Sequence, residues 1–190
     1  MSDAAVSPPL NAAELAALAR ATTHVADVAQ ATLPAQRPPW TASGVSVRAG
    51  QAYSVFASGR VRWSAGDPGL HGGPRFHLWV RVTPGGRIRN LREDSDTFIA
   101  DVDGAIEVAL YMGMWADAYG ALATSPALYT RLTGGLEAVI VAWRGDAATA
   151  LDALCTQTDV HGAFAAEARH LRTHPPLPAG WQPLIETGET

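Results

Sequence analysis

The sequence lacks lysine entirely, contains a single cysteine and has no long hydrophobic run. All fourteen basic residues are arginine, eighteen residues are acidic, and the formal net charge is −4. A chain with this balance and no basic run is not expected to bind nucleic acid, which requires a basic surface to neutralise phosphates. Cys155 has no second cysteine to pair with. This excludes an intramolecular disulfide and favours a cytoplasmic location over a disulfide-stabilised secreted scaffold.

No segment approaches the roughly 18 apolar residues that a membrane-spanning helix requires, so we expect no membrane span. The first ten residues, MSDAAVSPPL, contain an early aspartate and two prolines. They lack the basic region and the apolar run of a cleavable signal peptide. The length of 190 residues corresponds to one domain with appendages or to two small domains.

Two segments near the middle of the chain show strict alternation of side-chain character. Residues 105–112 and 136–143 alternate with period two, which is typical of strands because successive side chains point to opposite faces. The connection between them, residues 113–135, is rich in Gly, Ala, Tyr and Trp, and its only charges are Asp117 and Arg131. Connections longer than about 12–15 residues are often functional. We therefore expect a binding site in this connection.

Shorter strand patterns precede this pair, at residues 45–48, 52–57, 60–64, 87–91 and 97–100. Their spacing of about 8–12 residues and their Gly- and Pro-rich turns predict a mainly β, antiparallel sandwich or jelly roll. The clearest pattern lies at residues 76–82. It predicts an apolar face of Phe76, Leu78, Val80 and Val82 and a more polar face of His77, Trp79 and Arg81.

Both ends of the chain show helical patterns. Asn11 and Glu14 form a capping-box pair, from which we predict a helix that runs to about Thr32. Helical patterns return from Asp146 to about Cys155 and over residues 160–171. We divide the chain into an N-terminal helix with a Pro-rich linker (1–39), the sandwich (40–143) and a helical extension (144–190). The Pro-rich tail of that extension resembles a junction to a further domain.

The sandwich segment, residues 40–143, resembles the bacterial calcium-dependent galactophilic lectin domain. The carrying motifs are V-x-A-G-Q-x-Y-x-V-x-A-x-G at residues 47–59, the strand LWVRV with its P-G-G turn, and the strand IEVALY. A Gly-rich loop with Asp117, Tyr119 and Gly120, followed by an apolar strand, completes the likeness. The resemblance leaves out both helical ends of the chain. It implies a galactose-binding β-sandwich that is not an enzyme.

In that family, loops at one end of the sandwich hold a calcium ion, and two sugar hydroxyls complete its coordination. The resemblance places Trp63 at a calcium-contacting aromatic position and Asp117 at the acidic ligand. Tyr119-Gly120 matches a Tyr-Gly pair, but the family then supplies paired amides where this chain has Ala121 and Leu122. Calcium takes about six to eight oxygen ligands. We therefore expect the fold to carry over without a cofactor, and Asp117 is the candidate ligand if calcium binds.

The predicted ligand-binding set consists of residues that can contact a sugar. An aromatic face can stack on the C–H face of a sugar ring while the polar edge of the residue stays wet. Packing within the core is the competing interpretation for these aromatic residues, above all for those on strands. The set contains Trp63, Trp79, Tyr111, Trp115, Asp117 and Tyr119.

The other polar clusters are assigned to structure. Asp94, Asp96, Asp101 and Asp103 match no metal-binding spacing, and we expect them in solvated turns. The histidines show no metal-ligand spacing, no catalytic motif is present, and Cys155 lies in an apolar helical stripe. We therefore expect no enzyme.

Three functions remain as hypotheses. The first is a lectin-like module that binds carbohydrate at a loop end formed by residues 64–75 and 113–135. The second is a structural or oligomerisation module, in which the terminal helices dock the sandwich to a second copy or to other domains. The third is an enzyme whose site residues come together only in the fold. A homo-oligomer is expected for the first, because multivalency compensates weak sugar affinity.

Overall fold

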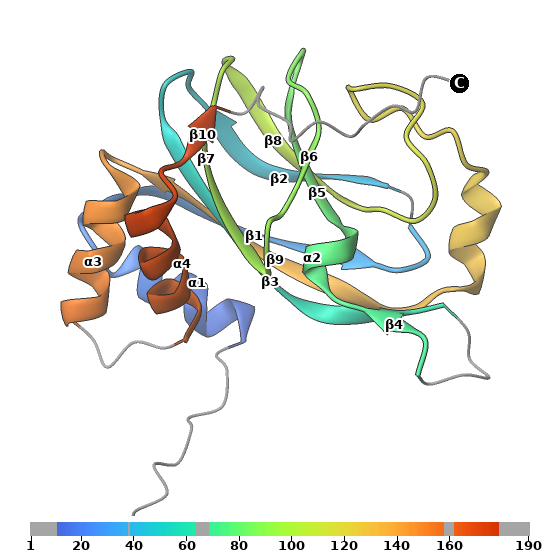
Figure 1. Ribbon diagram of the computed structural model, residues 1–190, viewed down its shortest axis with the longest axis horizontal. Coiled ribbons are helices and arrows are strands. Elements are labelled where there is room, and N and C mark those ends of the chain that lie inside the picture. The colour runs from blue at the N-terminus through green and yellow to red at the C-terminus, as the bar shows by residue number, and fades with distance from the viewer. Residues whose placement is uncertain (1–10, 38, 64–68, 158–161, 179–190) are drawn as a thin grey trace, which may run out of the picture.

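The structure, a computed structural model, describes residues 11–37, 39–63, 69–157 and 162–178. Two β-sheets pack face to face, and helices from both ends of the chain lie against the outside of the larger sheet (Figure 1). This confirms the predicted mainly β, antiparallel sandwich flanked by terminal helices. None of the described helices is long and apolar enough to cross a membrane.

The larger sheet has the strand order β1 (Val25–Pro34), β9 (Thr133–Trp143), β3 (Ala52–Arg62), β7 (Ser95–Ile99) and β10 (Leu177–Pro178), and β4 (His71–Gly72) also pairs with β3. The smaller sheet has the order β2 (Trp40–Val47), β8 (Gly104–Leu110), β5 (Leu78–Thr83) and β6 (Arg89–Asn90). Paired strands are antiparallel except β7 and β10, which are parallel. Most strands that lie side by side in a sheet are distant from each other in the sequence.

The main core lies between the two sheets. Alternate residues of each strand point into it, among them Val55 of β3, Ile106 of β8 and Ile140 of β9, all fully buried. Fully burying such a side chain contributes about 1.5–3 kcal/mol. The alternation in the two segments of the middle of the chain thus correctly predicted strands, β8 and β9.

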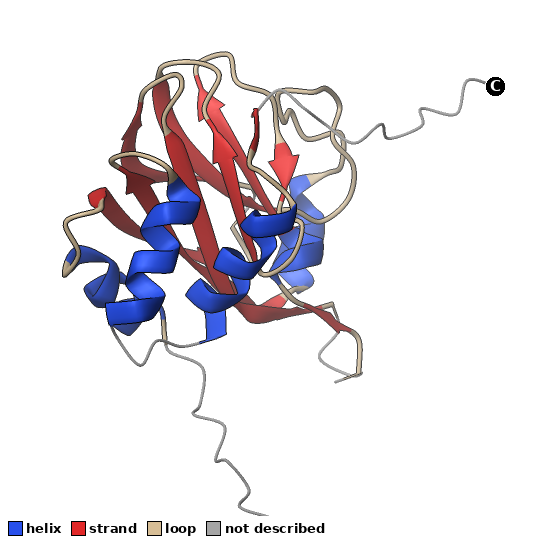
Figure 2. Ribbon diagram, turned by 60° about the vertical axis from the view of Figure 1, so that its left-hand side comes forward, coloured by secondary structure: helices blue, strands red, loops and turns tan. Residues whose placement is uncertain are grey.

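A second core separates the larger sheet from the helices α1 (Ala12–Arg20), α3 (Ala147–Gln157) and α4 (Gly162–Thr173), which cover its outer face (Figure 2). Phe164 of α4 meets Phe56 of β3 edge-on, with ring centroids 4.8 Å apart. On β9, Val141 and Trp143 face this second core. The apolar stripes of the helices are therefore buried against the chain's own sheet.

The N-terminal helix is shorter than predicted. The capping box of Asn11 and Glu14 is present, but α1 ends at Arg20, and residues 25–34 form β1. The prediction of a helix as far as Thr32 is wrong beyond Arg20. The apolar residues of this segment, such as Val28, fit a strand as well as a helix. Pairing of β1 with β9 along its whole length decides between the two. Tertiary pairing here overrides a helical spacing of apolar residues.

The strand predicted at residues 76–82 begins two residues late. Residues 74–77 form a short helix, α2 (Pro74–His77), with Pro74 in its first turn, and β5 starts at Leu78. Leu78, Val80 and Val82 face the core as predicted, whereas Phe76 is 69% exposed. Proline fits the first turn of a helix because it has no N–H to lose there. Its position explains why the strand pattern does not extend to Phe76.

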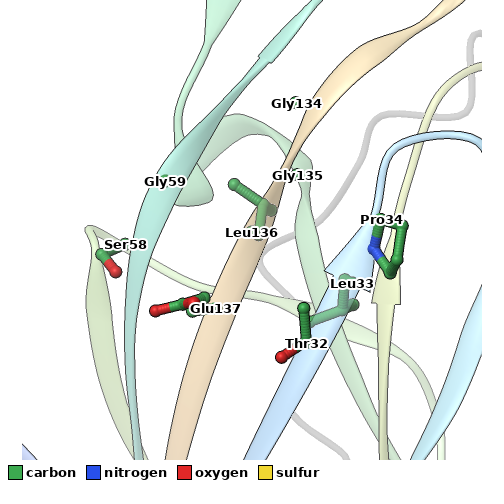
Figure 3. A pocket seen from close by; sticks show the side chains of 9 residues that line it. All are labelled: Thr32, Leu33, Pro34, Ser58, Gly59, Gly134, Gly135, Leu136 and Glu137. Atoms are coloured by element: carbon green, nitrogen blue, oxygen red, sulfur yellow. The ribbon is translucent and has the colours of Figure 1, made fainter. Parts of the chain in front are cut away.

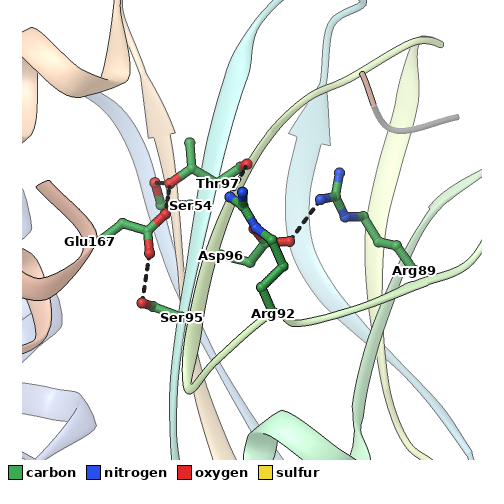
Figure 4. Close-up of polar contacts among 7 residues, drawn as sticks. All are labelled: Ser54, Arg89, Arg92, Ser95, Asp96, Thr97 and Glu167. Atoms are coloured by element: carbon green, nitrogen blue, oxygen red, sulfur yellow. Dashed lines mark hydrogen bonds and ion pairs between the residues drawn. The ribbon is translucent and has the colours of Figure 1, made fainter. Parts of the chain in front are cut away.

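A buried polar network fastens α4 to the larger sheet (Figure 4). The Glu167 carboxylate accepts hydrogen bonds from the Thr97 hydroxyl at 2.6 Å and the Ser95 hydroxyl at 2.7 Å. Thr97 also shares a 2.6 Å hydrogen bond with Ser54, which accepts one from the indole N–H of Trp143. Burial removes the water that would hydrate the Glu167 carboxylate. The hydrogen bonds from these two neutral hydroxyl groups replace part of that hydration.

The placement of Asp96 corrects the expectation that all four aspartates lie in solvated turns. Asp96 is fully buried on β7 and forms ion pairs with Arg89, at 2.7 Å, and with Arg92, at 2.5 Å. The expectation holds for Asp94, Asp101 and Asp103, whose side chains are exposed. Two arginines that precede the strand in the sequence pair with this carboxylate and offset the energetic cost of burying it.

Candidate functional site

The candidate site begins with the outward-facing residues of the smaller sheet. Ala109 of β8 pairs with Trp40 of β2 on one side and with Trp79 of β5 on the other. One row of the sheet therefore reads Trp40, Ala109, Trp79. The next row reads Ala42, Glu107, Arg81. The small Ala109 side chain leaves space between two indole rings that both stand on the outer face.

The long connection after β8 folds back over these rings. Trp115 and Leu122 form an isolated antiparallel bridge, so the segment between them is a small hairpin-like turn. Gly120 at its tip packs so closely on Trp40 that an added Cβ would lie 2.4 Å from the ring. The Trp40 indole N–H donates to the Gly120 carbonyl oxygen at 2.8 Å. Trp40 is thus an anchor point for the loop.

The aromatic side chains form a continuous stack, which we call the aromatic ladder: Arg81, Trp40, Trp115 and Tyr111. The Arg81 guanidinium lies 4.1 Å from the centroid of the Trp40 ring. Trp40 stacks on Trp115 at 5.3 Å, and Trp115 stacks on Tyr111 at 4.6 Å. Trp79 meets Trp115 edge-on at 5.7 Å. Offset stacking and cation–π contacts of this kind each contribute about 0.5–1.5 kcal/mol.

The rim of the ladder carries ordered charge. Arg81 forms a 2.7 Å ion pair with Glu107 and donates a 2.7 Å hydrogen bond to the Tyr119 carbonyl oxygen. Asp117 is exposed, and its Oδ1 accepts the backbone N–H groups of Ala121, at 3.0 Å, and Tyr119, at 2.8 Å. This donation, first from Ala121 and then from Tyr119, lowers the pKa of the Asp117 carboxyl. The carboxylate therefore stays ionised and holds the loop turn in one shape.

The structure brings together three of the six predicted site residues, Trp79, Tyr111 and Trp115. Tyr119 is 53% exposed and lies at the rim of the ladder with Asp117. Trp63 lies apart from the ladder, at the end of β3, where its ring meets His77 edge-on. All six therefore remain proposals as ligand contacts, with Trp63 in a separate position.

Trp40 and Arg81, which form one end of the ladder, were not among the site residues predicted from the sequence. Strand register places both of them. Trp40 lies in the same row as Trp79, with Ala109 between them, and Arg81 lies two residues after Trp79 on β5. The placing of Arg81 on the same polar strand face as Trp79 was a usable signal. No pattern within the sequence predicts that β2 pairs with β8.

Two indole donors, one in Trp115 of the ladder and one in Trp79 beside it, lack an acceptor. Within the described part of the chain, the indole N–H groups of Trp79 and Trp115 are buried and have no hydrogen-bond partner. A buried unpaired donor costs about 1–3 kcal/mol.

A pH dependence of stability is expected from His77, whose ring meets that of Trp63 edge-on. His77 Nδ1 lies 3.1 Å from the Tyr111 carbonyl oxygen, and its Nε2 is buried without a partner among the described residues. Burial lowers the pKa of His77, more than the contact with Tyr111 raises it. Below pH ~6.5 the unfolded chain therefore takes up a proton that the folded chain does not. The free energy of unfolding decreases as the pH is lowered through this range.

Urea unfolding of the wild type and of His77→Asn between pH 7.5 and pH 5 measures this effect. The Asn amide nitrogen can replace Nδ1 as donor to Tyr111 and does not titrate, so the variant should lose less stability on acidification. His170→Asn is the comparison variant. It should also reduce the loss of stability on acidification, because burial lowers the pKa of His170 as well. Superimposable pH profiles of His77→Asn and wild type would contradict the assignment.

The residues at Asp117 do not fit the calcium ion that the lectin resemblance implies. No group of three or more His, Cys, Asp or Glu side chains within the described ranges could hold a metal ion. Oδ1 of Asp117 is already the acceptor of two N–H groups. Calcium takes about six to eight oxygen ligands, and one carboxylate committed to its own loop does not provide them.

The fold and the site together define an antiparallel β-sandwich whose smaller sheet carries an aromatic, loop-covered outer face. No family model matches the chain, and no curated protein matches it. Eight chains of solved structures match it. One is described as "EclA N-terminal domain; PllA-like lectin", with 14% sequence identity and a TM-score of 0.48. The match covers 60% of this chain and 95% of that chain.

Proposed function

We propose that the protein is a non-catalytic carbohydrate-binding module of lectin type, with its site on the aromatic ladder and the rim around it. The observation that supports this proposal is the gathering of three tryptophans and a tyrosine on one outer face of the sandwich. Aromatic faces pair with the C–H faces of sugar rings, and polar groups at the rim select hydroxyl orientation.

The rim supplies the polar part of the proposed site. Asp117 and Tyr119 are exposed, and the loop hydrogen bonds fix the position of the Asp117 carboxylate before a ligand arrives. Carboxylates accept hydrogen bonds from sugar hydroxyls without needing a metal ion. Because the donor set does not fit calcium, the proposed binding is calcium-independent.

A structural or oligomerisation role is the second candidate. The sequence favours it more than the structure does. The terminal helices suggested a docking surface because a sandwich of this size does not require them. Their apolar residues, including Leu15, Leu151 and Phe164, are buried against the protein's own larger sheet. The helices therefore need no partner to bury their stripes, and the lectin-type proposal is preferred.

A glycan array on the purified protein, read with calcium and again with chelator, tests the proposed function. We expect binding to at least one neutral or acidic glycan in both conditions. Tyr119→Ala should weaken it about threefold to tenfold, the value of one lost stacking contact. Asp117→Asn should weaken it as well, because the amide keeps the loop acceptor but removes the charge.

Leu128→Ala is the matched control for these variants, because Leu128 is also about half exposed, at 48%, on the 3₁₀ helix η1 (Pro126–Arg131). Its glycan binding should equal that of the wild type. Absence of binding to every glycan in both conditions would reject the function. Binding that Tyr119→Ala and Asp117→Asn both leave unchanged would reject this site.

A further inference from the structure

The opposite face of the sandwich, on the larger sheet, carries a hollow. Helices cover only one half of this face and leave the other half open (Figures 1 and 2). On the open half, one row of side chains across β1, β9 and β3 reads Thr32, Glu137, Ser58. The next row reads Pro34, Gly135, Arg60. A hollow of ≈ 380 Å³ lies over these two rows.

The backbone itself keeps this hollow open. Gly59, Gly134 and Gly135 form its floor (Figure 3). A Cβ at Gly135 would lie 2.6 Å from the Leu33 carbonyl oxygen, and one at Gly59 would lie 2.5 Å from the Gly135 carbonyl oxygen. Side chains are therefore excluded here, and a flat ligand can approach the sheet closely.

The charges around the hollow are strongly one-sided. The described strand ends and turns that meet here are residues 31–37, 57–63, 69–72 and 131–137. Their only acidic residue is Glu137, and their arginines are Arg37, Arg60, Arg62 and Arg131. None of these four arginines forms an ion pair with a described residue. Asp67 lies outside the described residues.

This concentration of positive charge stands out in a chain whose net charge is −4. Arg60 and Arg62 alternate with the buried Val61, so both lie on the outer face with Ser58. Nη1 of Arg60 is held 2.7 Å from Nε2 of His71 on β4. Guanidinium groups that have no acidic partner among the described residues, placed at the end of an open hollow, are suited to carboxylate or sulfate groups, which they bind with paired N–H donors.

Glu137 distinguishes the kind of anion that fits. Its exposed carboxylate stands between the hydroxyls of Thr32 and Ser58 in the same row. A carboxylate in this position repels any polyanion, but it accepts hydrogen bonds from the hydroxyl groups that a saccharide carries on its rings and single-stranded DNA lacks. The required ligand has hydroxyl groups at one end and an anionic group at the other.

We propose that this hollow is a second binding site, independent of the aromatic ladder, that takes an acidic saccharide. The sugar ring lies on the glycine floor, its hydroxyls face Glu137, Thr32 and Ser58, and its carboxylate or sulfate faces Arg60 and Arg62.

Titration calorimetry on the full chain tests the proposal with four probes of similar size. An oligogalacturonate hexamer carries carboxylates, a heparin-derived hexasaccharide carries sulfates, maltohexaose is the neutral control, and a short single-stranded DNA is the polyphosphate control. We expect one or both acidic saccharides to bind, with affinity that falls as salt rises. The carboxylate and sulfate arms identify which anion is preferred. No binding of either acidic saccharide, or equal binding of DNA or maltohexaose, would overturn the proposal.

Two variants locate the site. Arg60→Gln with Arg62→Gln should weaken binding about tenfold or more, the value of lost charge-assisted hydrogen bonds. Arg87→Gln with Arg169→Gln removes the same charge from exposed residues elsewhere and should change affinity little. Glu137→Gln should weaken binding of the saccharide. General attraction of a polyanion would instead be strengthened by that change, and this result would overturn the proposal.

The outcome is separable from that of the aromatic ladder. Tyr119→Ala should leave binding of the acidic saccharide in the hollow unchanged. A loss of that binding in Tyr119→Ala, with none in the Arg60 and Arg62 variant, would place the ligand on the aromatic face and overturn the second site while supporting the first.

Discussion

Replacing Asp96 by alanine is expected to lower the free energy of unfolding by about 3–5 kcal/mol. The Asp96 carboxylate is fully buried and pairs with two arginines, one oxygen to Arg89 and the other to Arg92. Arg89 is itself buried, with its guanidinium 4.9 Å from the ring centroid of Phe98. Burial lowers the pKa of Arg89, and the charge of Asp96 opposes that shift. Without Asp96 a buried guanidinium is left unpaired.

Urea denaturation of Asp96→Ala and Asp101→Ala measures this difference directly. Asp101 is exposed in the turn after β7, so its removal should change stability by no more than about 0.5 kcal/mol. If Asp96→Ala proved as mild as Asp101→Ala, the ion pairs would not be formed in solution and Arg89 would be neutralised by some other group.

The parts of the fold that sequence predicted well are those governed by period-two alternation. The strands β8 and β9 were predicted correctly, because a strand repeats its environment every second residue. The N-terminal segment failed for a related reason. Val25 and Val28 are spaced as on a helix, yet β9 offers a partner strand from Trp143 to Gly135. A single segment does not reveal which long-range partner is available.

The candidate site was predictable only in part. The aromatic character of Trp79, Tyr111 and Trp115 marked them, but the stack also needs Trp40, which joins it through the pairing of β2 with β8. The hollow on the larger sheet was not predictable at all. Its central row joins Thr32, Glu137 and Ser58 from three strands that are far apart in the sequence. Such sites depend on strand register, which the sequence pattern alone leaves open.

Asp96 shows the same limit for charge. A run of acidic residues between strands resembles solvated turn chemistry, and three of the four aspartates conform to it. Asp96 differs because β7 is an interior strand of the larger sheet, between β3 and β10, and Arg89 and Arg92 lie close enough to neutralise it. The compensating arginines were visible in the sequence, but the burial that requires them was not.

Trp115→Ala is expected to release the loop that covers the smaller sheet and to cost about 2–4 kcal/mol of stability, somewhat less than a fully buried tryptophan. Trp115 is the middle member of the aromatic ladder, with Trp40 on one side and Tyr111 on the other. It also forms the bridge to Leu122 that closes the loop turn. That bridge is formed by backbone groups, so the substitution leaves it possible but removes the two stacking contacts that hold the loop turn against the sheet.

Three measurements separate loop release from a general loss of stability. Near-ultraviolet circular dichroism should lose the signal of coupled indoles, hydrogen exchange should accelerate at the N–H groups of Ala116 and Ala123, which bond within the loop, and glycan binding at the ladder should be abolished. Trp63→Ala is the control, since Trp63 is 43% exposed and meets only the edge-on ring of His77 among the described aromatic contacts. It should cost less than about 1 kcal/mol and leave loop exchange unchanged. Equal effects of the two substitutions would show that the ladder does not hold the loop, and the aromatic face would then lose its role as an ordered platform for a sugar.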